Sequence, residues 1–184
     1  MARIIKSIVN AIKGSVKGAL EGSANLGSTV VDSVKELTLT TIRGSTDLVV
    51  KGVQLPASIV KGVFEGLTNI GKGVIDLVKG IVNGAVQGAM ESGVEQQEAV
   101  EGSVKQAIHS SKELGLDIGT VAVEAIKGSV NAVKQVGGDT AVATKNAIVA
   151  AVEAAGEISI ETHKAVKEAI DKGIEGKDEI LKKL

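Results

Sequence analysis

The sequence predicts an all-α protein, and two patterns support that prediction. Apolar residues recur at the 3.6-residue spacing of one helix face along most of the chain. Glycine recurs at every fourth position inside several of these stretches, as in AIKGSVKGALEG (residues 11–22). A third indication is the core composition: 43% of the residues are hydrophobic, yet Phe64 is the only aromatic residue. Small aliphatic side chains let helices pack closely, so we expect a self-associating bundle of about six amphipathic, Gly/Ala-rich helices.

A first helix is expected over residues 2–22, where apolar residues form a stripe flanked by lysines. The segment GSANLGST then breaks this helix, and Ser28 or Thr29 can cap a second one that starts with TVVDSVKEL. The β-branched segment LTLTTIRGST favours a distorted helix or a turn, with a short strand as the alternative. The stripe and its lysines are Ile5, Ile8, Val9, Ile12, Val16 and Leu20, with Lys6, Lys13 and Lys17.

Pro56 marks the start of the longest expected helix, because proline fits the first turn of a helix. The pattern predicts one continuous helix over residues 57–92, broken near Ser92–Gly93. Apolar residues repeat there at a spacing of eleven, as in Phe64, Ile75 and Val86. That period keeps the apolar stripe on one side of a nearly straight helix.

Further helices are expected over about 94–114, 117–136, 140–156 and 159–182. No shift in composition divides the chain, so we interpret residues 1–184 as one domain, with positions 92–93 as the candidate subdivision. The expected stops and caps are Gly115, Gly137–Gly138 with Asp139 and Thr140, Gly156, and Ser159 or Thr162.

One short amphipathic unit occurs three times with variations. It reads IKGSVKGALEGS from Ile12, VKGIVNGAVQGA from Val78 and IKGSVNAVKQVG from Ile126. Similar units repeated along a chain indicate duplication of a short helix.

The glycines of this unit form a predicted ridge opposite the apolar stripe. Each glycine inside a helix costs about 0.8–1 kcal/mol relative to alanine, so some contact must offset the loss. We favour a second packing face, where another helix backbone approaches closely. The alternative is an exposed ridge that keeps the helix marginal until its stripe meets lipid. The predicted helix-packing ridge is Gly14, Gly18, Gly22, Gly80, Gly84 and Gly88.

The segment KGVFEGLTNIGKGVIDLVKGIV (Lys61–Val82) resembles the lipid-binding repeats of synucleins. More loosely, it is similar to the amphipathic helices of perilipins, apolipoproteins and bacterial phasins. The resemblance covers residues 2–22, 57–92 and 117–155 and implies reversible binding to lipid surfaces. The chain differs from synucleins in three ways. It lacks their full lysine-threonine-lysine-glutamate-glycine-valine unit, it carries a proline before its long helix, and it is more hydrophobic than they are. These departures favour a stably folded bundle over an unfolded lipid binder.

Composition and motifs argue against several classes of function. The net charge of −1 and the lack of aromatic stacking residues speak against nucleic acid as a partner, and the absence of cysteine excludes thiolate chemistry. His109, which could pair with Glu113, and His163 lack the spacing of metal ligands. The acidic cluster Glu95, Glu98 and Glu101 is interpreted as a solvated face. We therefore expect no enzyme activity, no cofactor and no metal.

The sequence favours a structural protein. We expect a non-enzymatic, self-assembling scaffold whose partner is another copy of itself, with an anionic lipid or hydrophobic surface as a second target. The expected location is cytoplasmic, including the periphery of a membrane. The alternative is a soluble bundle that carries a hydrophobic small ligand in an aliphatic interior. The candidate surface or lipid contacts are Lys6, Lys13, Lys17, Ile12, Val16 and Phe64; Phe64 also fits a place in the core.

Overall fold

The computed structural model describes residues 26–44, 54–67 and 73–184, and this part of the chain contains helices and no strand. The all-α prediction is confirmed, but the described helices number eight rather than about six. They are α2 (Leu26–Gly44), α3 (Gln54–Leu67), α4 (Val74–Glu91), α5 (Gln96–Glu113), α6 (Ile118–Gln135), α7 (Thr140–Ile158), α8 (Ile160–Gly173) and α9 (Asp178–Leu181).

Two expected helices are each divided into two. The predicted helix over 57–92 is α3 and α4, and α4 starts after Gly73, whose φ of 69° lies in the left-handed region. The predicted helix over 159–182 ends at Gly173, because Ile174 is extended and Gly176 is left-handed. In both cases the apolar spacing continues past the break, which is why periodicity alone missed it.

Three smaller expectations are also corrected. The segment LTLTTIRGST is helical as far as Gly44, since it completes α2. Helix α2 starts at Leu26, so Ser28 and Thr29 lie within its first turn rather than before it. Gly156 is no stop, because α7 continues to Ile158. The predicted helix over 2–22 lies outside the described residues.

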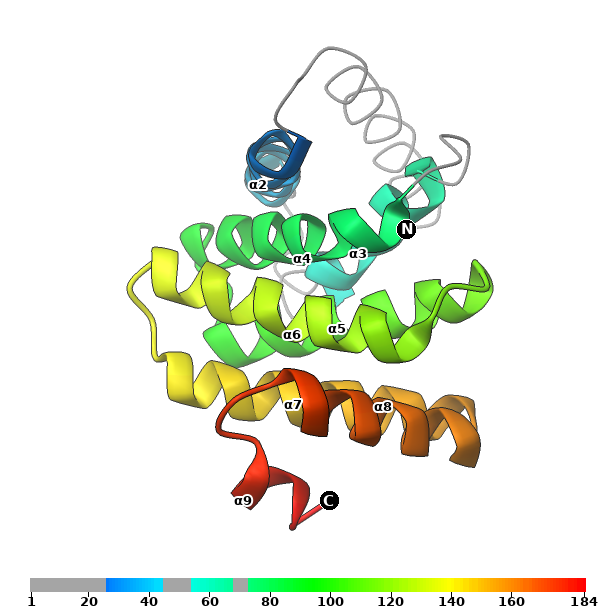
Figure 1. Ribbon diagram of the computed structural model, residues 1–184. Helices are drawn as coiled ribbons and strands as arrows, with labels where there is room; N and C mark the ends of the chain where they lie inside the picture. Colours follow the sequence, from blue (N-terminus) through cyan, green and yellow to red (C-terminus); the bar gives the residue numbers. More distant parts are fainter. Residues whose placement is uncertain (1–25, 45–53, 68–72) are drawn as a thin grey trace.

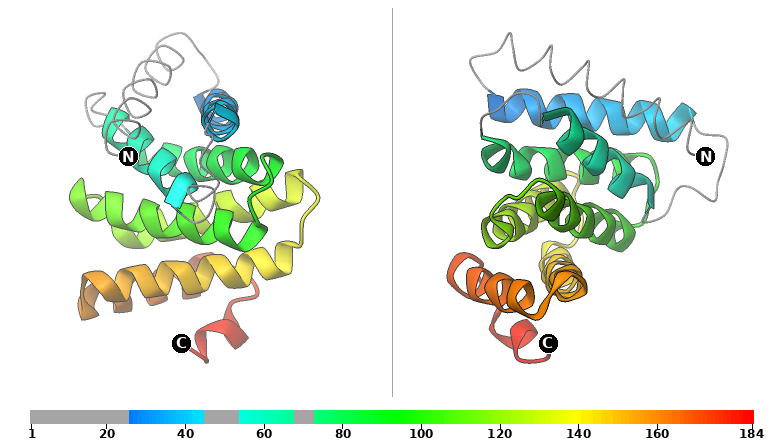
Figure 2. Two further views of the ribbon diagram at one scale, coloured as in Figure 1. Left: turned by 180° about the vertical axis from the view of Figure 1, so that it is seen from behind. Right: turned by 90° about the vertical axis from the view of Figure 1, so that its right-hand side faces the viewer.

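The helices stack in layers, as Figures 1 and 2 show. Helices α3 and α4, α5 and α6, and α7 and α8 form successive pairs, with α2 above the first pair and α9 beyond the last. Each helix packs mainly against its neighbours in sequence and against the helices two before and two after it. The even-numbered helices thus form one row and the odd-numbered helices a second.

The three connections between α4 and α7 share one design. Each places a glycine in the left-handed region, namely Gly93, Gly115 and Gly137. The residue after each glycine donates its backbone N–H to a carbonyl five residues earlier, closing the helix end. Asp117 and Asp139 then accept backbone hydrogen bonds at the start of α6 and α7. The predicted stops at Gly93, Gly115 and Gly137 are confirmed.

The core is aliphatic, with Phe64 fully buried in it. Helix α4 lies deepest, because every residue from Ile81 to Ala89 is buried. On its two sides α4 meets α2 and α6, and toward the odd-numbered row it meets α3 and α5.

Candidate functional site

Two glycines of α4, Gly84 and Gly88, face α2 at a distance that leaves no room for a side chain. A Cβ atom added at Gly84 would lie 2.5 Å from the Val31 carbonyl oxygen and 2.8 Å from the Val34 Cβ. At Gly88 it would lie 2.5 Å from the Thr38 Cβ. Such separations are far below carbon van der Waals contact, so glycine alone fits at these two positions.

Gly80 extends the same ridge with a looser contact. A Cβ there would lie 3.3 Å from Val30 Cγ1 and 3.4 Å from the Gly27 carbonyl oxygen. Gly80, Gly84 and Gly88 therefore follow a row of α2 carbonyls, one helical turn at a time and in the same chain direction. Two i, i+4 ridges lying alongside each other are the commonest way in which helices pack closely.

The other predicted site residues divide into two groups. The ridge residues Gly14, Gly18 and Gly22 and the surface candidates Lys6, Lys13, Lys17, Ile12 and Val16 lie outside the described residues. Phe64 is fully buried, so its place in the structure is the core and not a contact surface.

The next pair in the even-numbered row repeats the arrangement. Gly128 of α6 stands in the repeated unit where Gly80 stands in α4, and a Cβ on it would collide with the Lys79 carbonyl of α4. Farther on, a Cβ at Gly119 would lie 3.2 Å from the Ala169 Cβ of α8. In each pair of successive helices in this row, a glycine thus allows the two helices to pack closely.

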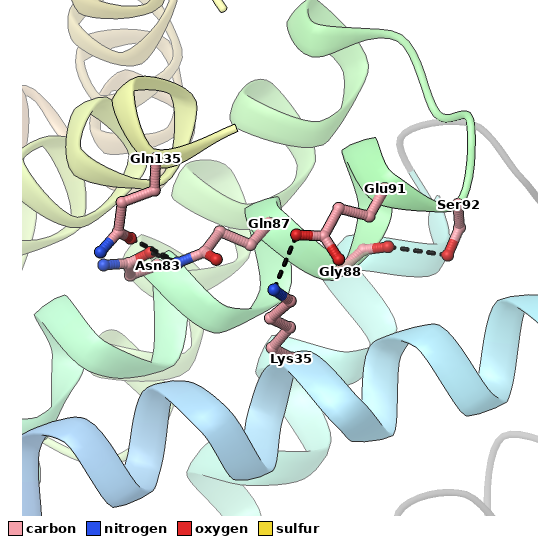
Figure 3. Close-up of polar contacts among 7 residues, drawn as sticks. All are labelled: Lys35, Asn83, Gln87, Gly88, Glu91, Ser92 and Gln135. Atoms are coloured by element: carbon pink, nitrogen blue, oxygen red, sulfur yellow. Dashed lines mark hydrogen bonds and ion pairs between the residues drawn. The ribbon is translucent and has the colours of Figure 1, made fainter. Parts of the chain in front are cut away.

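An amide cluster joins α4 to α6 beside the glycine ridge (Figure 3). Gln87 Nε2 donates to Asn83 Oδ1 at 2.6 Å and to Gln135 Oε1 at 2.5 Å. Asn83 and Gln87 keep only 7% and 6% of their surface exposed. Sequence reasoning missed this cluster, although Gln87 and Gln135 occupy the same place in two copies of the repeated unit.

At the surface, ion pairs join successive helices within each row. Lys35 of α2 lies 2.7 Å from Glu91 of α4, next to the glycine ridge (Figure 3). In the odd-numbered row Lys105 lies 2.7 Å from Glu153, and its hydrogen bond to that carboxylate raises the pKa of Lys105.

The two histidines lie against α7. The predicted partner of His109, Glu113, lies near Lys61 instead, and His109 Nε2 lies 3.2 Å from Glu157. A Cβ at Gly156 would lie 3.1 Å from His163 Nδ1. The described residues hold no group of three or more His, Asp or Glu side chains placed to bind a metal ion.

Comparison with solved structures bears on the layered arrangement. A crystal structure of the de novo designed helical repeat protein DHR7 matches with a TM-score of 0.53, covering 90% of this chain and 92% of that one. The fold is that of a helical repeat protein. At 18% identity the likeness concerns the fold alone.

Sequence comparisons add no family. No protein-family model matches the chain, and no curated protein matches it. Among the described helices, none is both long and apolar enough to cross a bilayer.

Proposed function

We propose that this protein is a non-enzymatic scaffold of stacked helix pairs that associates with copies of itself. The observation that carries the proposal is the fit of Gly84 and Gly88 against the backbone of α2. Gly14, Gly18 and Gly22 occupy the same positions in the unit from Ile12 as Gly80, Gly84 and Gly88 do in the unit from Val78. The sequence of the first unit therefore predicts a similar close-packing ridge for a further helix.

A second copy of the chain is the partner that suits such a ridge. Interior glycines destabilise a helix by about 1 kcal/mol each, and a closely approaching backbone offsets that loss. Ridge-to-ridge contact between two identical segments is self-complementary, which is the condition for a two-fold symmetric dimer.

The charged outer side of α8 supports a closed assembly over an open fibre. Several charged residues of α8 are exposed, and only Val166 and Ile170 of this helix are fully buried. Repeat proteins need such polar end helices to remain soluble, because an apolar end would stack indefinitely. We infer that association uses the first unit and leaves α8 in solvent. The exposed charged residues are Glu161, Lys164, Glu168, Asp171 and Lys172.

Light scattering with size-exclusion chromatography tests the proposal, over a range of concentrations and with or without anionic vesicles. Gly18→Val is compared with Gly44→Val, a control at a described helical glycine that has nothing within 4 Å of its Cβ position. We expect the wild type and Gly44→Val to form a defined oligomer without lipid, and Gly18→Val to be monomeric with unchanged helicity.

Two other results of this experiment would point away from self-association. A wild-type monomer that binds anionic vesicles through Lys6, Lys13 and Lys17 would replace self-association with coating of a lipid surface. A monomer at every concentration that also ignores vesicles would refute both.

A further inference from the structure

We propose that Asn83 is a self-modification site controlled by the docking of α2 on α4. When α2 leaves, the backbone nitrogen of Gly84 attacks the Asn83 side chain and converts it to aspartate or isoaspartate. Asn83–Gly84 is the one Asn-Gly pair among the 184 residues, and there is no Asp-Gly pair. Glycine is the following residue that hinders this ring closure least, because it has no side chain and a permissive backbone.

The chemistry needs water and nothing else. A bond forms between the Gly84 nitrogen and Asn83 Cγ while the bond from Cγ to Nδ2 breaks. The proton lost from the Gly84 nitrogen is transferred, through water, to the departing Nδ2 group, which leaves as ammonia. The resulting five-membered imide ring is then opened by water at one of its two carbonyl carbons. Opening at one carbonyl gives aspartate, and opening at the other gives isoaspartate, in which the main chain runs through the former side chain.

The docked structure holds the reacting atoms apart in three ways. Asn83 and Gly84 lie within the regular helix α4, whose backbone angles keep the Gly84 nitrogen from the Asn83 side chain. Asn83 Oδ1 accepts a hydrogen bond from Gln87 Nε2 at 2.6 Å, which directs the amide along the helix. The Val31 carbonyl of α2 lies against Gly84, so the backbone there has no space to rotate.

Release of α2 removes the restraint at the place where α4 is intrinsically weakest. Gly80, Gly84 and Gly88 are poor helix formers, and α2 packs against all three. Without α2 this stretch faces water on its glycine side, and local opening of the helix becomes more frequent. The reaction rate at Asn83 therefore reports how often α2 is undocked.

The modification also prevents α2 from docking again. Isoaspartate adds one methylene to the main chain, which breaks the helical register between Gly80 and Gly88. The glycines then no longer align with the carbonyls of Gly27, Val31 and Lys35. Aspartate would instead place a carboxylate at a position that is only 7% exposed. The modification is irreversible, so the modified fraction increases with the total time that α2 has spent undocked during the lifetime of the protein.

Peptide mapping by mass spectrometry tests the proposal, by following the gain of one dalton at Asn83 during incubation at neutral pH. Gly88→Val should undock α2, because its Cβ would lie 2.5 Å from the Thr38 Cβ, and Gly44→Val is the matched control. We expect Asn83 to react on the order of tenfold faster in Gly88→Val than in the wild type or the control. Asn131, at the equivalent position of the next unit but followed by alanine, should stay unchanged in all three.

A urea series on the wild type keeps the test decisive if Gly88→Val does not fold. Reaction at Asn83 should rise at urea concentrations where circular dichroism still reports most of the native helix. The proposal is overturned if the rate follows global unfolding alone. It is also overturned if Asn83 in the fully unfolded chain reacts no faster than Asn131, or if folded Gly88→Val reacts at the wild-type rate.

Discussion

Replacing Gly84 by alanine decides between the two explanations of the glycine ridge, because they predict opposite signs. If the ridge were exposed, alanine would stabilise the helix by about 1 kcal/mol through its higher helix propensity. If the ridge is a packing face, the added methyl group must displace α2. The structure places the new Cβ 2.5 Å from the Val31 carbonyl oxygen and 2.9 Å from the Lys35 backbone nitrogen.

The size of the effect follows from these distances. Ordinary carbon contacts lie at about 3.5–4.0 Å, so α2 has to move away by about 1 Å. Backbone atoms cannot rotate aside as a flexible side chain can, and overpacking of this kind costs about 1–3 kcal/mol. After subtraction of the propensity gain of about 1 kcal/mol, we expect Gly84→Ala to lower the free energy of unfolding by up to about 2 kcal/mol. Gly80→Ala, with contacts of 3.3–3.4 Å, should be within about 0.5 kcal/mol of the wild type.

Urea unfolding followed by circular dichroism measures both variants against Gly27→Ala. Gly27 lies in α2 with nothing within 4 Å of its Cβ position, so alanine there should be neutral or stabilising. The reasoning is refuted if Gly84→Ala is as stable as Gly27→Ala, since α2 would then not be seated on this ridge in solution.

Three further predictions concern other parts of the stack. Asp117→Ala should cost about 1 kcal/mol in urea unfolding, because the side chain accepts a hydrogen bond from the Thr120 backbone N–H. Hydrogen bonding with Thr120 lowers the pKa of Asp117. The difference in free energy of unfolding between Asp117→Ala and the wild type should therefore persist above about pH 4 and shrink at lower pH, as the carboxylate is protonated. A difference that does not change with pH would contradict this. Phe64→Ala should destabilise the fold by about 3–5 kcal/mol by thermal or urea unfolding, whereas a loss under about 1 kcal/mol would mean that Phe64 is not in the core. A double-mutant cycle on Lys105 and Glu153 should give less than about 1 kcal/mol of coupling, since both side chains are partly exposed. Because the folded-state pKa of Lys105 is raised, that coupling should be present at neutral pH and be lost in strong alkali, where the ammonium is deprotonated.

Local signals in the sequence predicted the connections well. Gly115 and Gly137 adopt the left-handed conformation expected of helix stops, and Asp139 and Ser159 cap the helices that follow. These features depend on residues only a few positions apart, so they can be read without knowledge of the fold.

Features that depend on distant pairs could not be read from the sequence in the same way. The break at Gly73 interrupts a spacing that continues unchanged from Phe64 to Ile75, so nothing in the periodicity marks it. The bond between Gln87 and Gln135 joins residues 48 positions apart and depends on how α4 and α6 align. The spacing of the glycines was enough to predict the ridge. Its partner, α2, could be identified only once the order of the helix layers was known.

The shared design of the connections has a consequence for how such a chain can evolve. A segment that runs from just after Gly93 through Gly137 contains one odd-numbered and one even-numbered helix with their closing turns. Its first side fits the preceding layer and its last side fits the following one, because each described layer makes its main contacts with the layers next to it. In-frame duplication or loss of this segment would therefore change the length of the protein while reusing contacts that already exist, so recombination within a gene can lengthen or shorten the stack without inventing a new interface.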